Sequence, residues 1–211
     1  MSERFLILHE GRKSETNYLS SLNRFLRDSP QADPAEPIFF VSLITGKEEN
    51  KKDRNGSGCY TQVAKAYQTD RANNRNARIY IWVDFDIYAR NDNGNWDLYQ
   101  TNPKSLPPFM FNHHNFEDFL AMHYPLEGEF GEWTARCRNN GHLNCPLHSD
   151  SYLPEYSAVF PGYTKNEMPF DIEPHLLLAL FENNRDSKHG LHSDFATFLE
   201  NKIPSRFLTE A

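Results

Sequence analysis

The chain has 211 residues and a net charge of −7, and 38% of its residues are apolar and 14% aromatic. This length suffices for one α/β domain with a sizeable hydrophobic core, and the aromatic content favours a folded protein over a disordered one. The negative charge does not by itself indicate nucleic-acid binding, although a metal-binding carboxylate cluster would account for part of it.

Three features lead us to expect a cytoplasmic protein without a membrane segment. No stretch approaches the roughly 18 consecutive apolar residues of a transmembrane helix. Glu3 and Arg4 lead directly into a strand-like run, which is not the pattern of a signal peptide. The three cysteines are an odd number, and Cys59 is far from Cys137 and Cys145, which argues against a disulfide framework.

In chain order, the first segments alternate between strand and helix. Phe5–Leu8 is a short apolar run that predicts a buried first strand. Residues 15–27 predict a helix, because Ser14 can cap it and its apolar residues recur on one stripe. Residues 38–43 predict the second strand, and residues 59–73 predict the second helix.

The rest of the chain continues this pattern less regularly. Residues 78–83 are rich in β-branched and aromatic side chains and predict the third strand, and residues 109–111 predict a short fourth strand. Further helices are predicted over residues 116–124, 174–183 and 192–201.

This order of elements favours an α/β fold with a mostly parallel sheet and helices on both faces. Right-handed crossovers place the carboxyl ends of parallel strands at one edge, where ligand sites form in such sheets. We expect a core over residues 1–126, a small irregular insertion over residues 127–162, and a C-terminal helical part over residues 163–211 that packs on the core.

Three carboxylates follow the strands of this predicted sheet. Glu10 ends the first strand, and Asp84 and Asp86 end the third, where their spacing of two residues places them on one face. Carboxylates that converge at one edge repel each other unless a cation compensates, and oxygen ligands select Mg²⁺ or Mn²⁺. One or two such ions would activate water and stabilise phosphate, so the pattern indicates phosphoryl-transfer chemistry. An isolated Asp-x-Asp more often caps a helix or turn, but its combination with Glu10 is more specific.

Two motifs resemble the signature of Toprim domains, a family that includes topoisomerases, bacterial primases and several nucleases. They are Leu6–Gly11, with a glutamate after the first strand, and Ile81–Asp86, with Asp-x-Asp after the third. The segment Glu10–Tyr18 more closely resembles the opening of RloB-like proteins, which are small Toprim-related proteins of bacterial abortive-infection and restriction loci. Asn115–Leu120 resembles their later Phe-Glu helix motif, although the usual preceding Asn-Pro-Cys is absent.

The resemblance extends to His123 and to the pair Tyr163 and Lys165, covering residues 5–125 well and the remainder thinly. It implies a Toprim-like fold and a Mg²⁺-dependent nuclease that serves as the effector of an anti-phage defence system. It also implies a separate partner ATPase of the ABC or AAA type. The chain has no Gly-x-x-x-x-Gly-Lys-Ser/Thr motif, so it is not itself a P-loop ATPase.

Four further residues are candidates for the same site. Glu117, near the start of a predicted helix, could supply a fourth catalytic carboxylate or could only favour the helix N-terminus. Arg12 and Lys13 follow Glu10 directly, and Lys165 lies in the last third of the chain. Each of these cations could bind substrate phosphate or could remain a solvated surface charge.

A separate zinc site is suggested by four competent ligands that lie close together in sequence, Cys137, His142, Cys145 and His148. A structural Zn²⁺ held by them would stabilise the predicted insertion. Their spacing is not a familiar zinc-finger pattern, so a histidine-rich loop with two incidental thiols is the favoured competing interpretation.

The leading hypothesis is a nuclease that hydrolyses phosphodiester bonds in DNA or RNA, with tRNA among the candidate substrates. The alternative is a non-catalytic Toprim-like module that docks on an ATPase or senses a nucleotide, but such a scaffold has no physical need for clustered carboxylates. A primase-like or topoisomerase-like transferase ranks last, because the chain is too short for the extra domains that those enzymes need.

Overall fold

Four parallel strands form the sheet at the centre of the protein. The computed structural model describes residues 3–9, 13–44, 60–75, 77–85, 109–144, 147–165 and 167–209. Within them the sheet has the order β2-β1-β3-β4, and each neighbouring pair is parallel. The strands are β1 (Glu3–His9), β2 (Ile38–Ile44), β3 (Ile79–Asp84) and β4 (Phe109–Asn112). The predicted α/β class and all four predicted strands are therefore confirmed.

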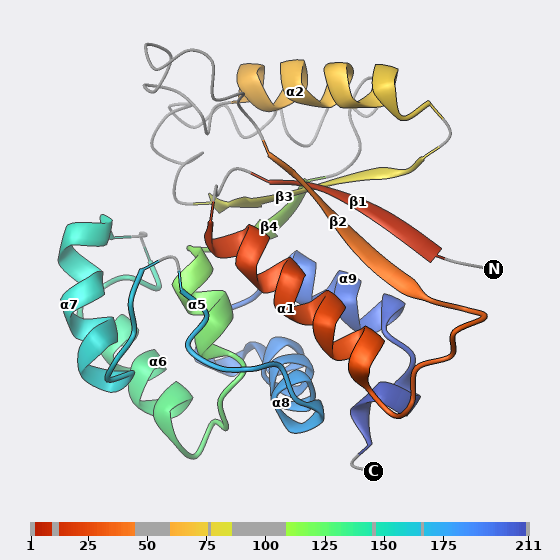
Figure 1. The fold of residues 1–211 in the computed structure, drawn as a ribbon. Coiled ribbons are helices and arrows are strands. Elements are labelled where there is room, and N and C mark those ends of the chain that lie inside the picture. The colour runs from red at the N-terminus through yellow and green to blue at the C-terminus, as the bar shows by residue number, and fades with distance from the viewer. Residues whose placement is uncertain are drawn as a thin grey trace.

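Helices cover both faces of this sheet, as predicted. In Figure 1, α2 lies on one face, and α1 and α9 lie on the other with the remaining helices beyond them. The α-helices are α1 (Ser14–Asp28), α2 (Tyr60–Asn73), α5 (Phe116–Ala121), α6 (Glu129–Asn139), α7 (Ser149–Val159), α8 (Pro174–Arg185) and α9 (Asp194–Lys202). Two short 3-10 turns, η1 (Ser187–His189) and η2 (Ser205–Leu208), follow α8 and α9. No helix in the described ranges is both long enough and apolar enough to cross a membrane.

Successive side chains of β3 point to opposite faces of the sheet, so each face receives a different set of residues. The odd-numbered residues of β3 pack in a small apolar cluster with Val63 of α2. Trp82 points the other way, into the larger core under α1, α5 and α9. Because side chains two residues apart share a face of a strand, Asp84 lies on the same side as Trp82.

The larger core is built mainly from aromatic rings that join distant parts of the chain. Trp82 of β3 stacks on Phe195 of α9 with 3.8 Å between ring centroids. Tyr18 of α1 meets Phe119 of α5 edge to face at 4.9 Å. These contacts hold α1, α5 and α9 against one face of the sheet, so the start of α5 is fixed close to the carboxyl ends of β3 and β4.

The expectation of an irregular insertion over residues 127–162 is wrong. This stretch contains α6 and α7, and α6 completely buries Phe130, Trp133 and Cys137 in the larger core. These three residues have helical spacing, but charged residues alternate with them. Pro154 lies inside α7, where a proline normally argues against a helix. The tertiary core stabilises both helices despite these unfavourable local features.

Candidate functional site

Asp84 ends β3 at the carboxyl edge of the sheet, where two N–H groups hold its carboxylate. Its Oδ1 accepts a hydrogen bond of 2.8 Å from the side-chain amide of Asn112. Its Oδ2 accepts one of 3.0 Å from the backbone N–H of Phe116, the first residue of α5. The carboxylate therefore joins the end of the sheet to the start of α5, where the helix dipole favours a negative charge.

Asn112 fixes the orientation of Asp84 and was not identified from the sequence. It lies opposite Asp84 in the pairing of β3 with β4. Its side-chain oxygen accepts hydrogen bonds from the indole N–H of Trp82 at 3.1 Å and from the hydroxyl of Ser193 at 2.8 Å. These two bonds leave only the amide nitrogen to face Asp84. The signal in the sequence was a polar residue at the end of the strand Phe109–Asn112.

Glu117, the second residue of α5, is buried with 4% of its surface exposed. Its Oε2 accepts a hydrogen bond of 2.8 Å from the hydroxyl of Tyr152 in α7. Its Oε1 accepts one of 2.8 Å from the hydroxyl of Tyr163. Tyr163 was singled out by the family resemblance, whereas Tyr152 lies in the stretch that was expected to be irregular. Two tyrosines that follow α6 in the sequence therefore position the carboxylate of Glu117.

The two tyrosine hydroxyls lie in a region of negative charge. Burial raises the pKa of Tyr163 above its ordinary value, and the charges of Glu117, Asp84 and Glu15 raise it further. Burial also raises the pKa of Tyr152, with Glu117 and Asp84 among the further causes. Both hydroxyls therefore stay protonated and donate to Glu117. Asp84 lies close to the same part of the chain, because its Oδ2 accepts a hydrogen bond from the backbone N–H of Phe116, the residue before Glu117.

The remaining carboxylates of the predicted site, Glu10 and Asp86, lie outside the described residues, so their convergence with Asp84 stays a prediction. The underlying expectation that strands one and three are parallel neighbours is confirmed, since β1 pairs with β3 and His9 lies opposite Trp82. The chain therefore leaves both strands at the same edge of the sheet.

The predicted phosphate-binding cations stay predictions as well. Arg12 lies outside the described residues. Lys13 immediately precedes α1 and is exposed, and Lys165 is exposed two residues after Tyr163. Both lysines can meet solvent or a ligand, and among the described carboxylates neither forms an ion pair with Asp84 or Glu117.

The carboxylates at this edge fit a hard divalent ion. Mg²⁺ binds oxygen ligands and commonly takes one or two protein carboxylates together with water and phosphate. Each oxygen of Glu117 accepts one tyrosine hydroxyl, and a carboxylate oxygen offers about two acceptor positions. Glu117 can therefore keep both tyrosines and still contact an ion.

The residue after Glu117 belongs to a different network. Asp118 accepts hydrogen bonds of 2.7 Å from the indole N–H of Trp133 and from Nε2 of His142. His142 must carry its proton on Nε2, because its Nδ1 accepts a hydrogen bond of 3.0 Å from the backbone N–H of Leu147. Cys137 lies beside them, with its sulfur 4.0 Å from Asp118 Oδ1. Every polar group of this buried cluster thus has a protein partner.

This network corrects the predicted set of zinc ligands. Cys137 and His142 do lie close enough to share an ion, but their third neighbour is Asp118. His148 is not part of this group: it is exposed, and its ring accepts a hydrogen bond from the backbone N–H of Asp150 at the start of α7. Cys145 lies outside the described residues. The close sequence spacing was misleading, because Cys137 lies on the buried face of α6 whereas His148 is exposed just before α7.

No family model, curated protein or solved structure matches the chain. The resemblance to RloB-like proteins therefore rests on the sequence motifs alone and stays a prediction. The function has to be argued from the arrangement of Asp84, Glu117 and their partners.

Proposed function

We propose that this protein is a Mg²⁺-dependent nuclease of the Toprim type that hydrolyses phosphodiester bonds in DNA or RNA. One observation carries the proposal: at the carboxyl edge of a parallel sheet, Asp84 accepts a hydrogen bond from the backbone N–H of Phe116, and the next residue is the buried carboxylate Glu117. Carboxylates that lie close together repel each other, and a bound cation would compensate their charge.

In this proposal Asp84 and Glu117, together with Glu10 and Asp86, hold one or two Mg²⁺ ions. A bound ion would supply an activated water and would neutralise the phosphate charge that develops during cleavage. Asn112 fixes the orientation of Asp84 through its own two hydrogen bonds.

The neighbouring side chains have positioning and binding roles. Tyr152 and Tyr163 position Glu117 by donating hydrogen bonds to it, because their raised pKa values keep both hydroxyls protonated at neutral pH. Arg12, Lys13 and Lys165 would bind the phosphate backbone on either side of the cleaved bond, where contacts position a nucleic acid without reading its sequence.

A partner ATPase of the ABC or AAA type would deliver or restrain the nuclease, as in anti-phage defence systems. The sequence resemblance and the lack of a nucleotide-hydrolysis motif in the chain support this part of the proposal. Affinity purification from the native operon should recover the ATPase with the chain. Recovery of only the free protein, fully active by itself, would contradict the partnership.

The activity itself is tested by incubating the purified chain with plasmid DNA, with total RNA and with purified tRNA in Mg²⁺ or Mn²⁺. The wild type should cleave at least one of these substrates, and chelation with EDTA should stop the cleavage. Glu117→Gln and Glu10→Ala should be inactive, while His175→Ala, which changes an exposed histidine near the start of α8, should cleave normally. If a preparation that includes the partner ATPase is also inactive, the protein is the non-catalytic module and not the nuclease.

A further inference from the structure

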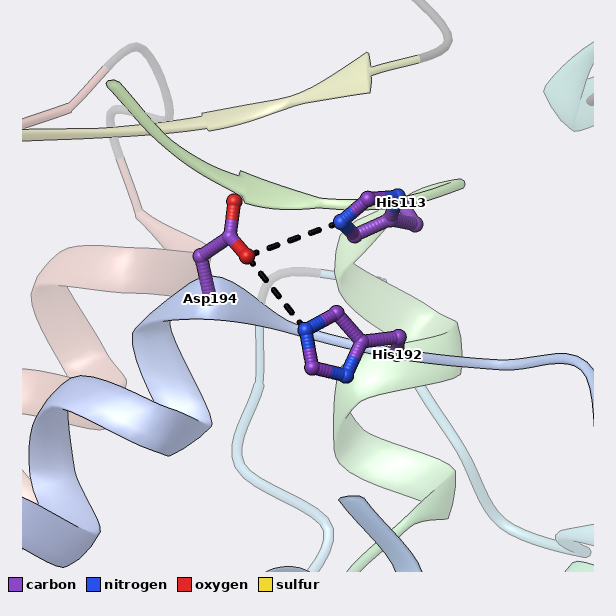
Figure 2. Close-up of side chains that lie close together, drawn as sticks. All are labelled: His113, His192 and Asp194. Carbon is purple, nitrogen blue, oxygen red and sulfur yellow. Dashed lines mark ion pairs between the residues drawn. The ribbon is translucent and has the colours of Figure 1, made fainter. Parts of the chain in front are cut away.

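A second cluster of potential metal ligands lies at the end of β4, beside the chain that leads into α9. His113 follows β4 directly, and His192 and Ser193 precede α9, which begins at Asp194. Figure 2 shows both imidazole rings directed at the same carboxylate oxygen of Asp194. Nε2 of His113 is 3.6 Å from Asp194 Oδ1, and Nε2 of His192 is 3.3 Å from it. One ligand atom from each of the three residues lies within 4.8 Å of the others.

The backbone holds these side chains together. The N–H of His113 donates to the carbonyl oxygen of His192 at 3.0 Å, and Asn112 forms an antiparallel bridge with Ser193. The N–H of Phe111 donates to Oδ2 of Asp194 at 3.1 Å, which leaves Oδ1 directed at the histidines. These contacts hold the segment between α8 and α9 along β4. The backbone therefore fixes the relative positions of the three side chains.

The hydrogen bonds around His192 also favour a metal ligand. Its Nδ1 lies 3.4 Å from the carbonyl oxygen of Asn184. A proton on Nδ1 that faces this carbonyl leaves Nε2, which is directed at Asp194, to bind either a second proton or a metal ion. Metal-binding histidines usually donate their second ring N–H to a carbonyl or carboxylate in this way.

We propose that His113, His192 and Asp194 bind a Zn²⁺-class transition-metal ion. Two imidazoles and one carboxylate are ligands that suit zinc and its first-row neighbours better than Mg²⁺ or Ca²⁺. Tetrahedral ligands on Zn²⁺ lie about 3.3 Å apart, given Zn–N and Zn–O bonds of about 2.0–2.1 Å. The two histidine–aspartate distances, 3.6 and 3.3 Å, are close to that spacing, and the ligand atoms of all three residues lie within 4.8 Å of one another.

The site is open to solvent, which decides what the ion would do. The side chains of His113, His192 and Asp194 are 43%, 40% and 38% exposed. Three protein ligands at an accessible position leave at least one coordination place for water or for an anion such as phosphate. By contrast, the Asp118 cluster is completely enclosed, and an ion there would have to displace the hydrogen bonds of Trp133 and His142.

The proposal does not depend on the nuclease, and metal titration tests it directly. Zn²⁺ should bind the full-length protein with one ion per chain in isothermal titration calorimetry. His113→Ala should weaken binding by more than about tenfold, because loss of a direct ligand should cost at least as much as loss of an outer partner. His175→Ala is the matched control: His175 also lies 3.3 Å from a carboxylate, that of Glu173, but is not part of any three-ligand group in the described ranges.

Co²⁺ absorption identifies the ligands independently. Binding to His113, His192 and Asp194 should produce visible bands without a thiolate charge-transfer band, and Glu117→Gln should leave these bands unchanged. A thiolate band would assign the ion to a cysteine and overturn the proposal. The proposal also fails if the wild type does not bind Zn²⁺, or if His113→Gln and His192→Gln bind it as tightly as the wild type while melting at the same temperature without metal.

Discussion

Glu117 and Asp118 are adjacent acidic residues of one short helix, each with 4% of its surface exposed, and yet their surroundings differ in kind. Asp118 accepts hydrogen bonds from the N–H groups of Trp133 and His142, which can only donate. Glu117 accepts hydrogen bonds from two tyrosine hydroxyls and lies near a second carboxylate, Asp84.

The comparison shows that burial alone does not separate a structural carboxylate from a functional one. N–H donors commit a carboxylate to a fixed network, because they cannot accept a hydrogen bond in return. Hydroxyl donors can rotate, so the group that they hold can exchange partners. We therefore expect substitution of Asp118 to affect mainly stability and substitution of Glu117 to affect mainly activity.

The largest effect should come from Glu117→Gln. Cleavage should fall by more than about 100-fold, the scale of losing one electrostatic group that stabilises a transition state. The free energy of unfolding should change by less than about 1 kcal/mol, because a tyrosine hydroxyl can rotate to accept a hydrogen bond from the new amide. Cleavage rates and urea denaturation measure the two quantities. A variant that unfolds easily but retains its activity per folded molecule would reverse the assignment.

Acidification should produce the next largest effect, through a third buried polar residue near this helix. Burial lowers the pKa of His123 from 6.5 to about 4. Between these values the unfolded chain binds a proton that the folded chain excludes, so stability is complete above about pH 6.5 and decreases as the pH falls towards 4. The free energy of unfolding should fall by about 3 kcal/mol through His123 alone as the pH decreases to 4.

Urea denaturation between pH 4 and 7 measures this loss, and comparison with His123→Gln, which cannot titrate, isolates the histidine. The variant should show a shallower decrease, whereas His175→Ala should follow the wild type. Identical slopes for the wild type and His123→Gln would mean that His123 binds its proton at the same pH in the folded and unfolded chains, so that burial beside Tyr18 does not lower its pKa.

Asp118→Asn should cost about 1–3 kcal/mol of stability, the cost of leaving a buried donor unpaired. One side of the new amide must face an N–H group of either Trp133 or His142, and neither can turn to accept. Cleavage per folded molecule should stay close to that of the wild type. If activity disappears while the melting temperature is unchanged, the Asp118 cluster is part of the active site.

Asp84→Asn should reduce both activity and stability. Its stability loss should be smaller than that of Asp118→Asn, because Asp84 is less buried than Asp118. Both of its oxygens accept from N–H groups, so the amide leaves the donor of Asn112 or of Phe116 unpaired at a cost of about 1 kcal/mol or more. We expect a lower melting temperature together with lost cleavage, measured by calorimetry and by nuclease assay. A variant that melts lower but still cleaves in Mg²⁺ would show that Asp84 is only a structural link between β3 and α5.

The sequence by itself determined the class of fold and the positions of its strands along the chain. Alternating strand-like and helix-like segments predict a parallel sheet, because parallel strands need crossover helices. Asp84 and Glu117 could be identified as well, since strand ends and helix starts are local features of the sequence. The predicted helix over residues 116–124 is shorter in the structure, where α5 ends at Ala121.

Only the tertiary structure decided the partners of these residues and the regular form of residues 127–162. Asn112 holds Asp84 from 28 positions away, and Tyr152 holds Glu117 from 35 positions away. His113 and Asp194 meet only because the chain before α9 lies along β4. Local pattern determines which face a side chain occupies, but the packing of helices on the sheet determines what that side chain meets. For this reason the sequence motif suggested Cys137 and His148 as ligands of one zinc ion, although Cys137 is buried in α6 and His148 is exposed.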